Sequence, residues 1–139
     1  MSTLDFEGGT IRHPSKAALW TGRVLSAVVI LFCIMDFTMK FMNLPIVNQT
    51  GEQLGWHTGT AMTLGILLAV CTALYAFPRT AILGAILLTG YLGGAVATHV
   101  RVDSPLFSHI LFGVYLGIMT WGGLWFRDTR VRALIPLSR

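Results

Sequence analysis

The sequence predicts an all-α, polytopic membrane protein: a bundle of four transmembrane helices in a single domain. Of its 139 residues, 54% are apolar and only 12% are charged, about half of the ~25% charged residues typical of soluble domains. The mean hydropathy is +0.69. Apolar residues also gather into four blocks, each long enough to cross about 30 Å of hydrocarbon. This composition excludes a disordered chain and an ordinary soluble enzyme.

The four blocks cover residues 17–41, 58–77, 80–98 and 110–126. All five prolines lie outside the blocks or at their edges, where the missing N–H does least harm to a helix. The second and third blocks are separated only by Pro78 and Arg79, which predicts a very tight turn. The longest connection, residues 42–56, is polar and is expected to be a surface loop.

The first block is expected to remain in the mature protein as a helix. No cleavage site of small residues follows its apolar core, so a secretory signal is the weaker interpretation. Two charged residues, Asp36 and Lys40, lie near the end of this block. Cys33 in the first block and Cys71 in the second are expected to be buried and unpaired. Aromatic residues expected to anchor block ends at the membrane interfaces are Trp20, Trp56, Tyr75, Trp121 and Trp125.

The distribution of basic residues predicts the orientation. With four spans, both termini and the Pro78-Arg79 turn share one side, which holds eight of the ten Lys and Arg residues. Only Lys40 and Arg101 lie on the other side. Because cytoplasmic loops carry the excess of Lys and Arg, we expect both termini in the cytoplasm. Residues 1–16 and the basic residues 127–139 are then cytoplasmic segments flanking a transmembrane domain at 17–126.

The net charge of +4 does not indicate nucleic-acid binding, because the basic residues are scattered between apolar blocks and form no run. The expected partner is the lipid bilayer itself. Small residues spaced four apart allow close helix contact in lipid, and Gly90, Gly94, Gly113 and Gly117 show this spacing in the third and fourth blocks. We expect these glycines to pack helices within the bundle, or else to dock a membrane-complex partner or a second copy of the chain.

Polar groups in the spans concentrate at the predicted outer end. In the first block, Gly22, Ser26, Val29, Cys33, Asp36 and Lys40 follow helical three- and four-residue steps and share one face. A carboxylate facing lipid is costly, so this face is expected to point into the bundle. Asp36 and Lys40 are then either an interfacial ion pair or part of a ligand pocket.

Each of the four predicted helices carries a titratable group at this end. Besides Asp36 and Lys40, the candidates for a shared ligand pocket are His57, His99, Arg101 and His109. Imidazoles at one level could hold a quinone carbonyl, or alternatively a haem or a metal ion. Nothing titratable is predicted between this mouth and the inner face, which argues against a proton path or transporter.

Two stretches resemble a known family. They are residues 77–102, FPRTAILGAILLTGYLGGAVATHVRV, and residues 121–128, WGGLWFRD; both are similar to the DoxX-like family of small bacterial membrane proteins. The resemblance implies a four-helix bundle in the cytoplasmic membrane, and in some relatives a link to quinone- or thiol-dependent oxidoreductases. Its polar motif corresponds to Thr98, His99 and Arg101, with Tyr91 one face away on the same helix as a further candidate for the ligand pocket. Many relatives carry a carboxylate in the second helix where this chain has Leu68.

Together these features predict an accessory or ligand-binding membrane subunit that serves a quinone-dependent redox partner through a polar pocket at the periplasmic end. The alternative is a structural or assembly subunit that docks into a larger complex through its small-residue helix faces. Whether the chain is itself an enzyme is left open by the sequence.

Overall fold

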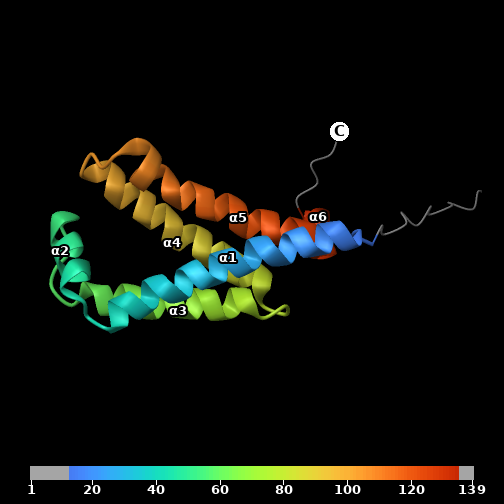
Figure 1. Ribbon diagram of the computed structural model, residues 1–139, viewed down its shortest axis with the longest axis horizontal. Coiled ribbons are helices and arrows are strands. Elements are labelled where there is room, and N and C mark those ends of the chain that lie inside the picture. The colour runs from blue at the N-terminus through green and yellow to red at the C-terminus, as the bar shows by residue number, and fades with distance from the viewer. Residues whose placement is uncertain (1–12, 135–139) are drawn as a thin grey trace, which may run out of the picture.

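The computed structural model describes residues 13–134, and every element in this range is a helix. In chain order the elements are α1 (Lys16–Phe41), α2 (Pro45–Gln53), α3 (Thr60–Ala76), α4 (Ala81–Arg101), the π-helix η1 (Leu106–Ile110), α5 (Leu111–Arg127) and α6 (Thr129–Leu134). Figure 1 shows the four long helices as an elongated bundle, with α2 at one end and α6 at the other. The predicted all-α bundle is confirmed.

Local sequence explains where the helices begin and end. The Ser15 side chain accepts a hydrogen bond from the backbone N–H of Ala18 and caps α1, satisfying a donor that the helix leaves free. The tight turn predicted at Pro78-Arg79 is confirmed, since α3 ends at Ala76 and α4 begins at Ala81. The Thr80 hydroxyl closes this turn by donating to the Leu74 carbonyl at 2.7 Å.

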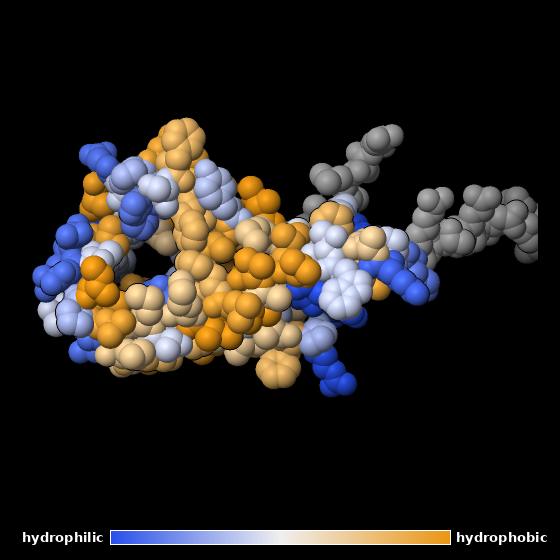
Figure 2. Space-filling model, viewed as in Figure 1, coloured by the Kyte–Doolittle hydropathy of each residue, from blue (hydrophilic) through white to orange (hydrophobic). Residues whose placement is uncertain are grey.

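Three segments are long and apolar enough to cross a membrane: α1, α4 and the continuous stretch Leu106–Arg127. The remaining long helix, α3, is apolar but has 17 residues. Large apolar side chains point outward along these helices; Leu31 of α1 and Ile118 of α5 are each 66% exposed, and Figure 2 shows apolar side chains over much of the visible surface. Such a surface is unfavourable in water but matches the interior of a bilayer.

The long helices form a ring in which α1 packs on α3 and α5, and α4 packs on α3 and α5. Figure 1 shows them gathered together near α6 and spread apart toward α2. We call the two ends of the bundle the α6 end and the α2 end. The buried stripe predicted on α1 is confirmed where it nears the α6 end, because Gly22, Ser26, Val29 and Cys33 are all buried.

The α6 end is tightly packed. A Cβ on Gly22 would lie 2.7 Å from the carbonyl oxygen of Gly123, and a Cβ on Gly84 would lie 2.2 Å from the backbone nitrogen of Tyr75. Neither position has room for a side chain, so α1 meets α5 and α3 meets α4 at backbone distance. These contacts fix the relative positions of the four helices at this end.

A buried polar network adds to this packing. The Tyr75 hydroxyl lies 2.9 Å from the Ser26 hydroxyl and donates to the Thr120 carbonyl at 2.8 Å, and Arg127 donates to Ser26 at 3.1 Å. Tyr75 is 0% exposed, so its predicted role as an interfacial anchor is wrong. It instead joins α1, α3 and α5 inside the bundle, where a hydrogen-bonded polar group is tolerated.

Two segments predicted to lie outside the four spans contain helices. The predicted loop at 42–56 contains α2, which begins with Pro45 in its first turn, a position that suits proline. The predicted tail at 127–139 contains α6, which folds back on the bundle. Arg132 donates to the Trp125 carbonyl at 2.7 Å, and Arg130 donates to the Pro78 carbonyl at 2.8 Å. Residues 135–139 of the predicted tail, and 1–12 of the predicted amino-terminal segment, lie outside the described residues.

The expected packing role of the glycine pairs needs correction within this chain. A Cβ on Gly113 would lie 2.8 Å from the Val96 side chain, so this glycine does mediate close contact between α5 and α4. By contrast, Gly90, Gly94 and Gly117 have no heavy atom within 4 Å of a Cβ built on them. The glycines that bring helices together are chiefly Gly22 and Gly84, outside the spaced pairs. Cys33 and Cys71 are buried and free, as predicted.

Candidate functional site: a cavity at the α2 end

A cavity of about 450 Å³ opens between the helices where they separate. Its walls come from α1, α4 and α5, with α2 and the start of α3 beside its mouth. Figure 2 shows a deep hollow at this end of the molecule. The volume falls in the range of small-molecule binding sites, about 300–1,000 Å³.

The cavity wall includes an acid–base pair from the predicted polar stripe. Lys40 donates to Asp36 at 2.5 Å, four residues earlier on α1. The two side chains are 16% and 33% exposed respectively, so the pair is half-buried and borders the cavity. Its charges largely cancel each other, which reduces the cost of placing them near apolar walls.

Tyr91 of α4 also lines the cavity. Its side chain is half-buried, and its hydroxyl makes no hydrogen bond to any residue that the structure describes. Because the described residues contain no side-chain polar atom that is both sealed from the surroundings and unpartnered, this hydroxyl is accessible, and it belongs to a residue of the cavity wall. It is available to a ligand as a donor or an acceptor.

Two histidines meet at the mouth of the cavity. His99, in the last turn of α4, and His109, in η1, pack edge to face with ring centroids 5.6 Å apart. His99 Nδ1 lies 3.0 Å from the Ser104 hydroxyl, and His109 Nδ1 lies 2.7 Å from the Ser108 hydroxyl. Each serine contact holds its ring in place and leaves Nε2 without a partner from the described residues.

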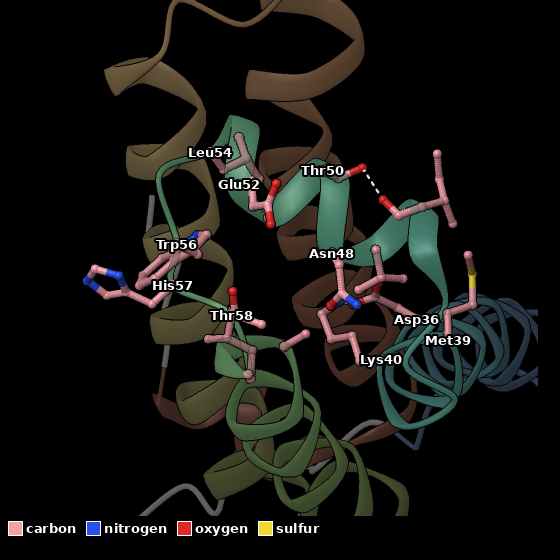
Figure 3. A pocket seen from close by; sticks show the side chains of 16 residues that line it. Asp36, Met39, Lys40, Asn48, Thr50, Glu52, Leu54, Trp56, His57 and Thr58 are labelled. Carbon is pink, nitrogen blue, oxygen red and sulfur yellow. Dashed lines mark hydrogen bonds and ion pairs between the residues drawn. The ribbon is translucent and has the colours of Figure 1, made fainter.

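Two of the predicted pocket residues do not face this cavity. Arg101 instead donates to the Leu54 carbonyl at 2.5 Å, which ties the end of α4 to the end of α2. His57 borders a second cavity, and Figure 3 shows its ring directed away from the other labelled side chains. The sequence placed both residues at the correct end of the bundle, but could not show where their side chains point.

The second cavity, of about 270 Å³, lies under α2. Asp36 and Lys40 border both cavities, as do Thr50, Leu54 and Trp56. Figure 3 shows Asn48 and Glu52 of α2 among its polar lining. The ion pair therefore lies between the cavity beneath α2 and the larger cavity between the long helices, both of which are largely apolar.

Gly90 and Gly94 do not have the helix-packing role that their spacing predicted. Both line the larger cavity, both are exposed, and no heavy atom lies within 4 Å of a Cβ built on either. Larger side chains at these positions would enter open space beside the cavity. The regular spacing that predicted helix contact therefore places two residues without side chains on the α4 wall of the cavity.

Sequence reasoning missed the apolar walls and the contribution of α2. Phe32 and Phe112 form an edge-to-face pair with centroids 4.9 Å apart, and Leu116 lies beside them on the cavity wall. No sequence pattern distinguishes these residues from the other apolar residues of their helices. The spacing of Thr50 and Leu54, one turn apart, could have indicated that α2 turns one face toward the bundle.

The residues do not form the three-histidine metal site considered from the sequence. Figure 3 shows the His57 ring directed away from the other labelled side chains, and residues 13–134 contain no group of three or more His, Cys, Asp or Glu side chains positioned to hold a metal ion. The polar groups that do converge are hydrogen-bonding groups: one ion pair, one phenol and two imidazoles.

The apolar helices and the cavity between them define the class of this molecule: a small multi-helix membrane protein with a ligand-sized space inside its bundle. A family model described as the DoxX-like family matches residues 24–123, which include every residue that lines either cavity. The chain therefore belongs to the DoxX-like family. No curated protein and no solved structure matches it.

Proposed function

We propose that this protein is an accessory subunit that binds a small lipophilic molecule, such as a quinone, in the larger cavity and presents it to a redox partner. The observation that carries the proposal is the wall of α4, where Gly90 and Gly94, with no heavy atom within 4 Å of a built Cβ, line the larger cavity together with Tyr91 and His99. A site of this kind, mostly apolar with a few polar groups, is typical of small-ligand binding.

The arrangement in the membrane is part of the proposal. At about 1.5 Å per residue, α3 is roughly 26 Å long, close to the thickness of the hydrocarbon core, and we propose that it completes a set of four spans. The α6 end carries most basic residues of the described chain, among them Arg23, Arg79, Arg127 and Arg130. We therefore place this end in the bacterial cytoplasm and the cavity near the periplasmic face.

The proposal is tested by identifying what the protein retains when it is purified gently from its own membrane. Mass spectrometry of an organic extract and an optical spectrum together report quinone, haem or another lipophilic compound. We expect a quinone to co-purify with the wild type and to be lost from Gly94→Leu, whose side chain would occupy the cavity.

Gly93→Leu is the matched control, because Gly93 also has open space around its Cβ but does not line either cavity. We expect this variant to retain the bound compound. The proposal is wrong if Gly94→Leu retains as much of it as Gly93→Leu, or if the wild type holds only phospholipid.

A second candidate function is docking into a larger membrane complex. Gly117 of α5 has open space around its Cβ and lies outside both cavities, so a partner helix could approach there. Loss of a co-purifying protein from Gly117→Leu, but not from Gly94→Leu, would support docking as the principal function.

A further inference from the structure

We infer that the ligand is a neutral molecule with a hydrogen-bond acceptor, and that Tyr91 is the donor that recognises this acceptor. The inference rests on the proposed binding role of the larger cavity and adds the chemical class of the ligand. It depends on two separate features of the cavity: its balance of charges, and its one open hydroxyl.

The charge balance excludes a charged headgroup. Asp36 and Lys40 are the carboxylate and the ammonium that line the larger cavity, and they are paired with each other at 2.5 Å. The two imidazoles of the lining, His99 and His109, are bonded through Nδ1 to Ser104 and Ser108. Arg101, the cation that could have bound an anionic ligand, is bonded to the Leu54 carbonyl and does not line the cavity. A charged ligand would therefore lose its hydration without gaining an unpaired counter-ion.

The unpartnered hydroxyl of Tyr91 favours a ligand that carries a hydrogen-bond acceptor. The other hydroxyl hydrogens on the α4 and α2 walls are already donated, from Thr98 to the Gly94 carbonyl and from Thr50 to the Ile46 carbonyl. Tyr91 has no such partner among the described residues, and it lies on the same cavity wall as the apolar Leu92 and Ala95. A ligand carbonyl in contact with Tyr91 would satisfy the phenol, whereas a pure hydrocarbon would leave it unpaired.

Three probes built on the same six-membered ring test the charge balance and the open hydroxyl separately. Duroquinone is neutral and carries carbonyl acceptors, durene is the corresponding hydrocarbon, and tetramethylbenzoate is the corresponding anion. Duroquinone also has no free ring position for thiols to attack. Each probe is titrated into the full-length protein in lipid nanodiscs, and its partition into empty nanodiscs is subtracted.

We expect the wild type to bind duroquinone more tightly than durene, and tetramethylbenzoate most weakly. One net hydrogen bond corresponds to roughly a fivefold change in affinity, so Tyr91→Phe should weaken duroquinone binding by about this factor and leave durene binding unchanged. Tyr115→Phe is the control, since Tyr115 is an exposed phenol of α5 outside the cavity, and it should bind all three probes as the wild type does.

The inference is overturned if Tyr91→Phe binds duroquinone as the wild type does, or if tetramethylbenzoate binds most tightly. A failure of the proposed function gives a different result: no probe then binds the wild type above the lipid background, or Gly94→Leu binds every probe unchanged. If duroquinone and durene bound equally and Gly94→Leu abolished the binding of both, the cavity would still be the binding site. Tyr91 would then not be the group that selects the ligand.

Discussion

The two ends of this bundle are built from the same residue types but have opposite packing. At the α6 end, glycines bring backbones together, and Tyr75 is completely buried with its hydroxyl bonded to two other helices. At the α2 end, Gly94 faces open space and the hydroxyl of Tyr91 has no partner among the described residues. Glycine and tyrosine therefore stabilise the fold at one end and create a binding cavity at the other.

The difference shows what each end contributes. Close packing and satisfied hydrogen bonds at the α6 end hold the helices in position. This allows them to diverge toward α2 without filling the space between them. The following substitutions compare the two ends, in order of decreasing expected effect.

The largest difference in stability is expected between Gly84→Ala and Gly90→Ala, which make the same substitution at two positions of α4. The new methyl at Gly84 would meet the Tyr75 backbone, an overpacking that costs on the order of 3 kcal/mol. At Gly90 it would enter open space, and the better helix propensity of alanine would be neutral or stabilising by up to about 1 kcal/mol. Thermal unfolding in detergent checks this, and equal stabilities of the two variants would contradict the contrast between the ends.

A smaller loss of stability is expected from Tyr75→Phe. The change removes the hydrogen bonds to Ser26 and to the Thr120 carbonyl, and losing them inside the bundle costs about 1–2 kcal/mol. Tyr91→Phe should leave the unfolding temperature unchanged, because its hydroxyl makes no bond within the described chain. If both variants were equally destabilised, Tyr91 would have a structural partner and would not be free for a ligand.

Arg101→Met is expected to act locally. Arg101 holds the Leu54 carbonyl at the end of α2, and α2 itself has no buried residue. Residues of low burial open most readily, so amide exchange across Pro45–Gln53 and the following turn should become severalfold faster while global unfolding changes little. Hydrogen exchange with mass spectrometry measures this. Unchanged exchange there, or a general loss of protection in α1 and α3, would contradict a local role.

The smallest effect is expected at the carboxyl-terminal side of the α6 end, where Asp128 pairs with Arg130 at 2.8 Å. Hydrogen bonding from Arg130 lowers the pKa of Asp128 below its ordinary value. This stabilisation is therefore fully present above the ordinary carboxyl pKa and is lost as the pH falls through the lowered one. For an exposed pair it amounts to less than about 1 kcal/mol. Asp128→Asn should remove this part of the acid dependence of unfolding, and an unchanged acid dependence would show that the pair does not contribute.

The sequence predicted the helices well because hydrophobic blocks, prolines and basic flanks act locally. It also placed Asp36, Lys40, His99 and His109 at one end of the bundle, since a residue's position along a helix gives its depth. It could not predict that Arg101 bonds α2, because that bond joins residues 47 apart in the sequence. Nor could spacing show whether Gly94 contacts a neighbouring helix or lines a cavity, since a small residue suits both roles.

The most direct test of a binding role for the α2 end is the amount of duroquinone bound per protein in nanodiscs, measured for the wild type, Gly94→Leu and Gly93→Leu at one saturating concentration. We expect one site to be filled above the lipid background in the wild type and in Gly93→Leu, and to be lost in Gly94→Leu. Equal binding by the two leucine variants would contradict the assignment of this cavity as the binding site.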